Sequence, residues 1–453
     1  MPGFTESLSQ FKYILFFVTL IFGVPLGYFL SINFPKIEKV IFFFMIFFTA
    51  RMEDINFVSH ELYRGTSRGF EIGMVDLMTF IIFLLILHRR NRYPIRWFPP
   101  GSVLYLSYFF FSFLSIGNAT LYLEFFYEIW KMIRMYFYFW VIYNYINSFD
   151  KFEEMMKGFS IIIIFISVFV LKQKYIDGIF QTPGPFPHQN SLVMYLTILN
   201  CLVFAYIMNK KRKIKLWYWL LVLGLGTVSV ISTYSRAGLV VYAIAIATVL
   251  FFSFVEGASV RKVIITFMVM VLGVIVLIRA MDTIIQRFET APEESTNTRI
   301  LLAQSAVNMA NDKTLGIGLN NFGLKVNLPY PYSSHIEGIT PESKNGLVET
   351  IYLMIAAETG WHNLVVFLIM LFWFYFRNFA SYIKYRNTDI HYLTIGIAGG
   401  LLGIYLQSSL EWVLKQTNNF YQLMMVFAII VVLPKLERRY KILQRKRSIY
   451  YAG

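Results

Sequence analysis

Residues 348–376 read VETIYLMIAAETGWHNLVVFLIMLFWFYF, an almost wholly apolar run that directly follows the longest polar stretch of the chain, residues 280–347. The run exceeds the roughly 20 residues that an α-helix needs to cross a bilayer. Two carboxylates, Glu349 and Glu358, interrupt it. A charged side chain costs about 2.5–3.5 kcal/mol near the centre of a membrane helix and less near its ends. The stretch therefore predicts a membrane protein with functional candidates at this point.

The composition of the whole chain agrees with a membrane protein. It has 453 residues, of which 57% are hydrophobic, 19% aromatic and only 15% charged, whereas soluble domains carry about 25% charged residues. The predicted fold class is all-α: a polytopic integral membrane protein with about 12–13 transmembrane helices and one large periplasmic loop. The expected spans are 11–30, 37–50, 71–88, 102–117, 123–145, 155–172, 190–208, 216–233, 237–255, 263–280, 348–376, 392–411 and 418–434.

The formal net charge is +15, and the distribution of the basic residues along the chain indicates a membrane topology. Short connections rich in Lys and Arg mark the cytoplasmic side of a membrane protein. Such clusters occur at 88–96, 210–215, 261–262, 377–386 and 435–447. Residues 280–347 hold seven acids and five bases and alternate with the basic clusters, so we expect this loop and the active site to face the periplasm. The C-terminus is then cytoplasmic, and anionic lipid headgroups rather than nucleic acid are the partners of the excess charge.

The chain divides into four parts on this topology. Residues 1–279 form an N-terminal bundle of transmembrane helices, and 280–347 form the large periplasmic loop with amphipathic helices. Residues 348–434 return to transmembrane helices, and 435–453 form a basic cytoplasmic tail. The amphipathic start of the long loop suits a position on the membrane surface, where it admits a lipid tail.

Polar residues gather in the connections expected to face outward, namely 51–70, 117–122, 173–189, 232–236, 280–347 and 411–417. Several have structural alternatives. Arg236 is either functional or a snorkelling residue at a helix end, and Asn190 is either functional or a helix cap. Arg287 and Arg299 either bind a ligand or pair with nearby acids. Gly316-Ile317-Gly318 is interpreted as a tight turn.

Signatures of cofactor chemistry are absent from the sequence. The six histidines are scattered without a pair at ligand spacing. The chain has no Gly-Lys phosphate loop and no dinucleotide fingerprint. The single cysteine, Cys201, lies in an apolar run and is interpreted as a packing residue. We therefore expect a reaction without metal or other cofactor.

The order of the outward-facing motifs resembles the O-antigen ligase/polymerase superfamily of bacterial membrane glycosyltransferases. The resemblance covers roughly residues 50–420 and is strongest from 232 to 362. The motifs that carry it are Tyr63-Arg64-Gly65, Arg68-Gly69-Phe70-Glu71, Val75-Asp76-Leu77, Phe186-Pro187-His188-Gln189-Asn190, Ser235-Arg236-Ala237-Gly238, Arg287-Phe288, Thr298-Arg299, Gly316-Ile317-Gly318-Leu319-Asn320-Asn321-Phe322, and Tyr352-Leu353 with Glu358-Thr359-Gly360-Trp361.

The resemblance implies a GT-C-like enzyme of the bacterial inner membrane. Members of the family move a glycan from an undecaprenyl diphosphate carrier to an acceptor: lipid A-core for ligases and another lipid-linked repeat for polymerases. The reaction inverts the anomeric carbon without a metal, and arginines hold the diphosphate. The implied partners are the lipid-linked donor, a glycan or lipid-linked acceptor, membrane lipids and polysaccharide assembly proteins.

Carried onto this chain, the resemblance makes Arg236, Arg287 and Arg299 the diphosphate-binding candidates, because guanidinium groups bind phosphate oxygens in pairs. Ligases commonly carry a His-Asn pair where this chain has Glu349-Thr350. Glu349 is therefore the candidate general base, with His335 in reserve. The departure favours polymerisation, or ligation of another exopolysaccharide. The expected sugar and acceptor residues are Glu61, Arg64, Arg68, His188, Asn190, Tyr352 and Glu358.

A transporter or flippase of a lipid-linked glycan is the alternative function. It would use the same arginines for binding without turnover. Alternating access needs polar groups in the membrane that face both sides, whereas the candidates here lie on one side only. The sequence therefore favours the enzyme.

Overall fold

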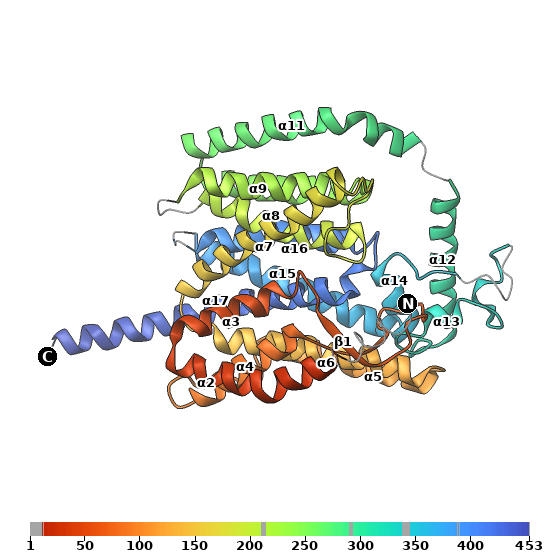
Figure 1. Cartoon of the computed structure of the whole chain (residues 1–453), viewed down its shortest axis with the longest axis horizontal. Helices are drawn as coiled ribbons and strands as arrows, with labels where there is room; N and C mark the ends of the chain where they lie inside the picture. Colours follow the sequence, from red (N-terminus) through yellow and green to blue (C-terminus); the bar gives the residue numbers. More distant parts are fainter. Residues whose placement is uncertain are drawn as a thin grey trace.

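Long helices lying side by side make up most of the molecule (Figure 1). The computed structural model describes residues 11, 13–209, 214–289, 293–337, 345–386, 388 and 390–452. Within these residues, six helical segments are long and apolar enough to cross a membrane: Tyr13–Asn33, Asp150–Tyr175, Gln189–Asn209, Arg236–Val255, Trp361–Lys384 and Thr417–Glu437. The predicted helical, polytopic membrane fold is confirmed. Every one of the expected spans overlaps a helix.

The helices follow one another along the chain with short connections. They are η1 (Thr19–Gly23), α2 (Val24–Asn33), α3 (Pro35–Phe47), α4 (Met74–His88), α5 (Ser102–Leu114), η2 (Ser115–Asn118), α6 (Tyr122–Tyr145), α7 (Asp150–Tyr175), α8 (Gln189–Asn209), α9 (Leu216–Ile231), α10 (Arg236–Val255), α11 (Val260–Glu289), α12 (Glu293–Asp312), α13 (Phe322–Lys325), η3 (Pro331–Ser333), α14 (Ile351–Thr359), α15 (Trp361–Lys384), α16 (His391–Gln407), η4 (Val413–Lys415) and α17 (Thr417–Ala452).

The centre of the bundle is α8, whose apolar window is wholly buried. Helix α16 packs closely against it because its glycines leave room for the neighbouring backbone. A Cβ atom on Gly400 would lie 2.5 Å from Ile198 Cγ1, and one on Gly399 would lie 2.7 Å from the Ala245 carbonyl oxygen of α10. Small residues at this spacing allow membrane helices to approach closely. The sequence of α16 thus fixes the contact between α8, α10 and α16.

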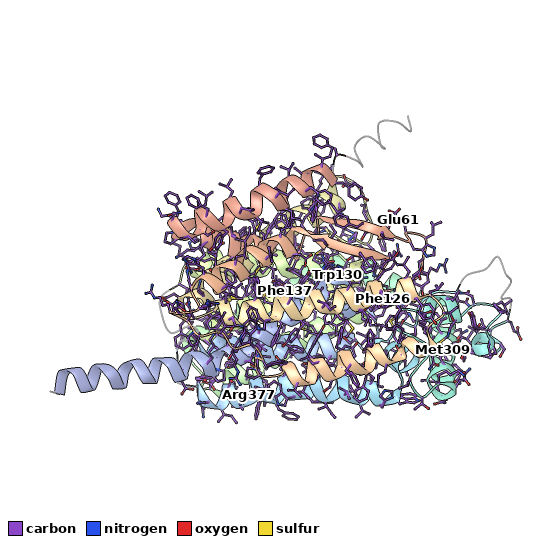
Figure 2. All side chains as sticks on the ribbon, turned by 90° about the horizontal axis from the view of Figure 1, so that it is seen from below. Glu61, Phe126, Trp130, Phe137, Met309 and Arg377 are labelled. Carbon is purple, nitrogen blue, oxygen red and sulfur yellow. The ribbon has the colours of Figure 1, made fainter. Side chains whose placement is uncertain are left out.

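The bundle has two distinct ends (Figure 1). The loop end carries residues 51–73, 115–121, 176–188, 232–235, 293–337 and 408–416, and α12 lies across it. The basic end carries residues 89–101, 146–149 and 256–259, and α17 extends beyond it. In Figure 2, Glu61 is labelled near one end of the molecule and Arg377 towards the other. The polar connections expected to face outward therefore do share one end of the bundle.

Two features of the fold differ from the simple helix pattern. The expected connection 51–70 contains an antiparallel pair, β1 (Asp54–Ser59) and β2 (Gly69–Gly73), with Asp54 opposite Gly73. The expected span 348–376 is split into α14 and α15 at Gly360, whose φ of 88° suits glycine. Both features lie at the loop end and shape the site described next.

Two helices also end later than the sequence predicts. Helix α11 extends to Glu289, beyond the expected end of its span at 280. Helix α17 continues to Ala452 through Pro434, so the basic tail expected from residue 435 continues a helix. Both extensions lie where apolar sequence gives way to polar sequence, and hydropathy alone places a span's end at that change.

Candidate active site

A cavity of about 1090 Å³ opens at the loop end. Its walls are the β1–β2 hairpin, the Pro185–His188 segment, the residues before α14, and the connection between α16 and α17. Four of the residues expected from the sequence to bind or react with sugars line it together: Glu61, Arg68, His188 and Glu349. Asp54, Glu71 and Glu411 add three further carboxylates. The cavity is therefore polar, predominantly acidic and large enough for an extended ligand.

Glu349, Glu411, Arg299, His188 and Asn190 form what we call the carboxylate centre. Arg299 Nη2 lies 3.5 Å from Glu411 Oε1 and 4.0 Å from Glu349 Oε2. Glu411 is almost fully buried, whereas the Glu349 side chain is 33% exposed and faces the cavity. Arg299 comes from α12, so the long loop expected from the sequence does deliver a cation to the site. Among the described residues, its ion-pair partners are Glu349 and Glu411; the side chains of the nearby acids expected as alternative partners lie outside the described residues.

The carboxyl group of Glu411 has a raised pKa. Burial, the charge of Glu349 and a hydrogen bond with Glu349 together raise the pKa of Glu411 to about 8, although Arg299 and Asn190 oppose the shift. Two carboxylates in hydrogen-bonding contact cannot both ionise cheaply. At neutral pH, Glu411 therefore holds its proton.

His188 and Asn190 support this arrangement from the start of α8. Asn190 Nδ2 donates a 2.5 Å hydrogen bond to Glu411 Oε1, and the Asn190 backbone N–H donates to His188 Nδ1 at 3.2 Å. Burial lowers the pKa of His188, and Arg299 lowers it further while Glu349 opposes both. A neutral imidazole whose Nδ1 accepts a hydrogen bond carries its proton on Nε2. His188 is therefore a hydrogen-bond donor in the cavity wall.

The hairpin supplies a second acidic wall. Burial and the neighbouring Glu71 carboxylate raise the pKa of Asp54 to about 7, with Arg134 opposing the shift. Arg134 itself is buried, and its Nη2 lies 2.7 Å from Asp76 Oδ2. Among the residues that the structure describes, no cluster of three or more ligating side chains is placed to hold a metal ion. The carboxyl groups of this wall have oxygens that can accept hydrogen bonds from sugar hydroxyls.

Glu358 lies in a different environment from Glu349. Its Oε2 is 2.8 Å from Lys415 Nζ, and both side chains are almost completely buried. Lys415 also lies 3.8 Å from Glu128, which is 2.7 Å from Lys131. We call these four residues the buried ion cluster. Glu128 also accepts hydrogen bonds from Thr66 and Ser67 of the hairpin loop, so the cluster joins the walls of the cavity to α6. Glu358 was expected at the sugar site. In the structure it does not line the cavity, and its buried ion pair with Lys415 supports the cavity wall instead.

The glycine-rich stretch 315–322 ties the long loop to the bundle. Gly316 has a φ of 71°, and a Cβ atom there would lie 2.3 Å from the backbone of Glu358. Asn321 Oδ1 accepts the backbone N–H groups of Thr120 and Leu121, which open α6. Asn320 bonds the hairpin loop through the backbone of Ser67. The tight turn expected here is present, and its role is to place α12 and therefore Arg299.

The remaining candidates lie away from the cavity lining. Tyr352 donates to the Tyr405 carbonyl of α16 at 2.9 Å, and His335 contacts the Leu301 carbonyl of α12 at 3.0 Å. Arg64 is exposed on the hairpin loop. The side chain of Arg287 lies outside the described residues. Neither His335 nor Tyr352 is brought to the carboxylate centre.

Arg236 opens α10 beside a second, apolar cavity of about 550 Å³. Ser235 caps the helix, because its Oγ accepts the Gly238 N–H at 3.2 Å. Ile231 and Leu239, on either side of Arg236 in the sequence, line the apolar cavity between α9, α10 and α11. We call this cavity the apolar groove. Thr182 Oγ1 donates to the Ser232 carbonyl, so the segment that carries His188 contacts the connection between α9 and α10, two helices that line the groove.

The match to a known family falls on this part of the chain. Residues 219–368 match the O-antigen ligase family model, Wzy_C. The resemblance drawn from the motifs is confirmed over this stretch, which is similar to the O-antigen ligase family and covers about a third of the chain. The O-antigen ligase match includes Arg236, Arg299 and Glu349, whereas His188, Glu411 and the hairpin lie outside it. No curated protein matches the chain.

Glu411 is the main residue that sequence reasoning did not assign to the site. It follows an apolar run and begins one of the short outward connections, directly before Trp412. An acid at the boundary of an apolar run is the same kind of signal that marks Glu349. However, no local pattern pairs the two carboxylates, because they are 62 residues apart and meet only when α16 returns to the loop end.

Proposed function

We propose that the protein transfers a glycan from an undecaprenyl diphosphate carrier to an acceptor hydroxyl at the periplasmic face of the inner membrane. The product would be a polymerised or ligated surface polysaccharide. The observation that carries the proposal is the carboxylate centre: the Glu349 carboxyl group faces a large cavity, beside Glu411, whose pKa is raised, and the cationic Arg299. The O-antigen ligase match over residues 219–368 supports the reaction class.

In this proposal Glu349 accepts the proton of the acceptor hydroxyl as its oxygen attacks the anomeric carbon of the donor. The bond from that carbon to the diphosphate oxygen breaks, and the electron pair leaves with the diphosphate. Arginines stabilise the developing charge without a metal, since a guanidinium is always charged and binds phosphate oxygens in pairs. Arg299 and Arg236 are our candidates, with Arg287 as a third.

The apolar groove fits the lipid part of the same donor. Its lining is almost entirely apolar and lies between membrane helices, including the part of α11 that belongs to the expected span 263–280. A polyprenyl chain already lies in hydrocarbon in the bilayer, so the groove would hold it through close packing rather than through the hydrophobic effect. With the tail in the groove, its diphosphate would reach the mouth beside Arg236. The sugars would extend toward the cavity past the Thr182–His188 segment. This segment contacts the α9–α10 connection through Thr182 and lines the cavity through His188.

The proposal is tested in cells that lack the protein, complemented with wild type, Glu349→Gln or Arg236→Ala at matched membrane abundance. We expect wild type to restore long-chain polysaccharide and both variants to leave unpolymerised or untransferred units. Glu53→Gln is a matched control, because Glu53 is an exposed acid in the same region that pairs with Arg51 outside the cavity. Normal polymer from Glu349→Gln would exclude Glu349 as the base.

The same cells separate the enzyme from the transporter alternative. If the protein is a glycosyltransferase, lipid-linked units accumulate on the periplasmic side when it is missing. If it is a flippase, they accumulate on the cytoplasmic side. Labelling of intact cells with a probe that cannot cross the inner membrane distinguishes the two results.

A further inference from the structure

The basic end of the bundle contains a pocket of about 400 Å³ that the proposed reaction does not use. Four cations line it: Arg92 and Arg96 from the connection before α5, Arg377 from α15, and Lys435 from α17. No carboxylate is among the described residues of its lining. We call it the basic pocket. It lies at the opposite end of the helices from Glu61 and the carboxylate centre (Figure 2).

The arginines of the basic pocket differ from their neighbours in lacking carboxylate partners. Within the described part of the chain, no carboxylate lies at ion-pair distance from Arg92, Arg96 or Arg377. Other cations at this end are paired: Arg89 with Glu38 at 2.8 Å, Lys384 with Glu437 at 2.6 Å, and Arg386 with Glu256 at 3.4 Å. Uncompensated cations that converge on one pocket indicate an anionic ligand.

The backbone holds the basic pocket in shape. Asn144 at the end of α6 accepts the Arg96 backbone N–H at 2.9 Å and donates to the Arg96 carbonyl at 3.2 Å. Trp140 donates to the Trp97 carbonyl at 3.0 Å. Lys435 donates to the carbonyls of Tyr143 and Ile146, which secures α17 to α6. The segment that carries Arg96 is therefore positioned before any ligand arrives.

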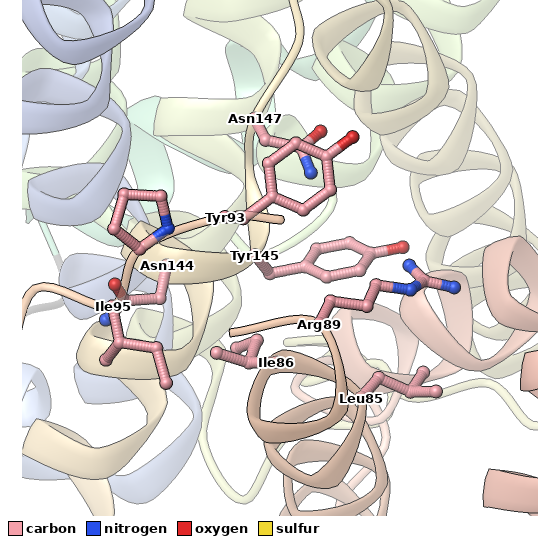
Figure 3. Close-up of a pocket in the computed structure, with 9 residues that line it drawn as sticks. Leu85, Ile86, Arg89, Tyr93, Ile95, Asn144, Tyr145 and Asn147 are labelled. Carbon is pink, nitrogen blue, oxygen red and sulfur yellow. The ribbon is translucent and has the colours of Figure 1, made fainter. Parts of the chain in front are cut away.

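A smaller cavity beside the basic pocket is a poor alternative site (Figure 3). It shares Tyr93, Asn144 and Asn147 with the basic pocket, but its volume is only about 20 Å³, which is room for one or two waters. Its arginine, Arg89, binds Glu38 through two hydrogen bonds of 2.8 and 3.0 Å. The charge of Arg89 is therefore already neutralised. Of these two cavities, only the basic pocket is large enough for a ligand.

The surroundings of the basic pocket are apolar and aromatic. Val431, Pro434 and Pro100 form part of its wall. The adjacent side chains of Trp97 and Phe98 are 62% and 65% exposed. Exposed aromatic residues next to basic residues at a helix end are typical of the membrane–water interface. A ligand here meets cations on one side and acyl chains on the other, which is the environment of a phospholipid headgroup.

We propose that the basic pocket binds the phosphate of an anionic phospholipid, with Arg92, Arg96 and Arg377 on the headgroup and its acyl chains along the adjoining apolar surface. The shared chemistry with free phosphate is the anionic phosphoryl oxygen, for which arginine is well suited. The lipid is favoured because the pocket lies among interfacial aromatic residues and apolar helix surface. The proposal is independent of the proposed glycosyl transfer.

The test is native mass spectrometry of the full-length protein in detergent, titrated with phosphatidylglycerol or with phosphatidylcholine. We expect tighter binding of phosphatidylglycerol. Arg96→Gln and Arg377→Gln should each weaken it about fivefold, as expected for the loss of one cation near a membrane surface. Arg90→Gln is the matched control, since Arg90 is an exposed residue of the same connection outside the pocket lining. Arg90→Gln should bind phosphatidylglycerol as tightly as the wild-type protein does.

Two results would overturn the proposal. One is equal weakening by Arg90→Gln, which would show a general effect of surface charge. The other is displacement of the lipid by millimolar inorganic phosphate, which would identify a site for free phosphate instead. The thermal unfolding midpoint of each variant, measured without added lipid, shows whether a loss of binding reflects a damaged fold.

Discussion

Two groups of charged residues lie at the loop end of the bundle, and they differ in how their charges are balanced. The buried ion cluster contains two acids and two bases, all almost fully excluded from solvent. The carboxylate centre contains two acids and one arginine, and it opens into the cavity. The same residue types therefore do different work. Where charges are balanced and dry, they hold elements together; where they are unbalanced and reachable, they can exchange a proton with a ligand.

The strongest test of this comparison separates the two carboxylates of the centre. We expect Glu349→Gln to lower glycosyl transfer by the purified protein about 10²–10⁴-fold, which is the usual contribution of a general base. Glu411→Gln should lose much less at neutral pH, because Glu411 is already protonated there and glutamine keeps a neutral hydrogen-bonding group. Initial rates at matched protein concentration measure both. Equal losses would mean that the pair acts as one unit.

The buried ion cluster should respond in stability rather than in chemistry. Lys415→Met leaves Glu358 buried without its 2.8 Å partner, and removal of one member of a buried pair costs about 3–5 kcal/mol. Thermal unfolding in detergent should show a large fall in the midpoint. Adding Glu358→Leu to this variant should recover much of the loss, since an apolar pair needs no compensation. If the double variant is less stable than the single one, the cluster has a role beyond charge balance.

The raised pKa of Glu411 predicts a pH dependence of stability. Between the ordinary value of 4.5 and about 8, the folded protein holds a proton that the unfolded chain has released. Stability should therefore fall as pH rises through this window, by up to about 1.4 kcal/mol per unit, and this contribution is lost above about pH 8. Glu411→Gln should flatten the profile, while a smaller dependence below pH 7 remains from Asp54. Identical profiles for wild type and variant would contradict the raised pKa of Glu411.

The smallest effect is expected at the rim of the cavity. Glu61 is exposed and lines the cavity, and we propose that it contacts the acceptor sugar. Loss of one exposed hydrogen bond costs about 0.5–1.5 kcal/mol, so Glu61→Gln should raise KM for the acceptor by a few-fold and leave kcat unchanged. Steady-state kinetics with varied acceptor separate the two constants. A large fall in kcat would place Glu61 in the chemistry.

The expected helices were predictable because membrane spans are long, apolar and locally encoded. Each expected span overlaps a helix, and the polar connections share one end because successive spans alternate in direction. The β1–β2 hairpin was not predicted, and the stretch Glu358-Thr359-Gly360-Trp361 is compatible with a kink anchored by Glu358 without specifying two separate helices. A single glycine does not specify a split helix, and the hairpin sequence has no two-residue turn signal between strands that are nine residues apart.

The sequence by itself determined that the chain is a membrane bundle, and it pointed to Glu349, His188, Arg68 and Glu61 at one end of it. Hydropathy, charge bias and motif order carry that information residue by residue. Only the tertiary structure decided which charges are balanced: it paired Glu358 with Lys415 and brought Glu411 and Arg299 to Glu349. Charge balance and burial depend on contacts between distant segments, and those contacts exist only once the helices have packed.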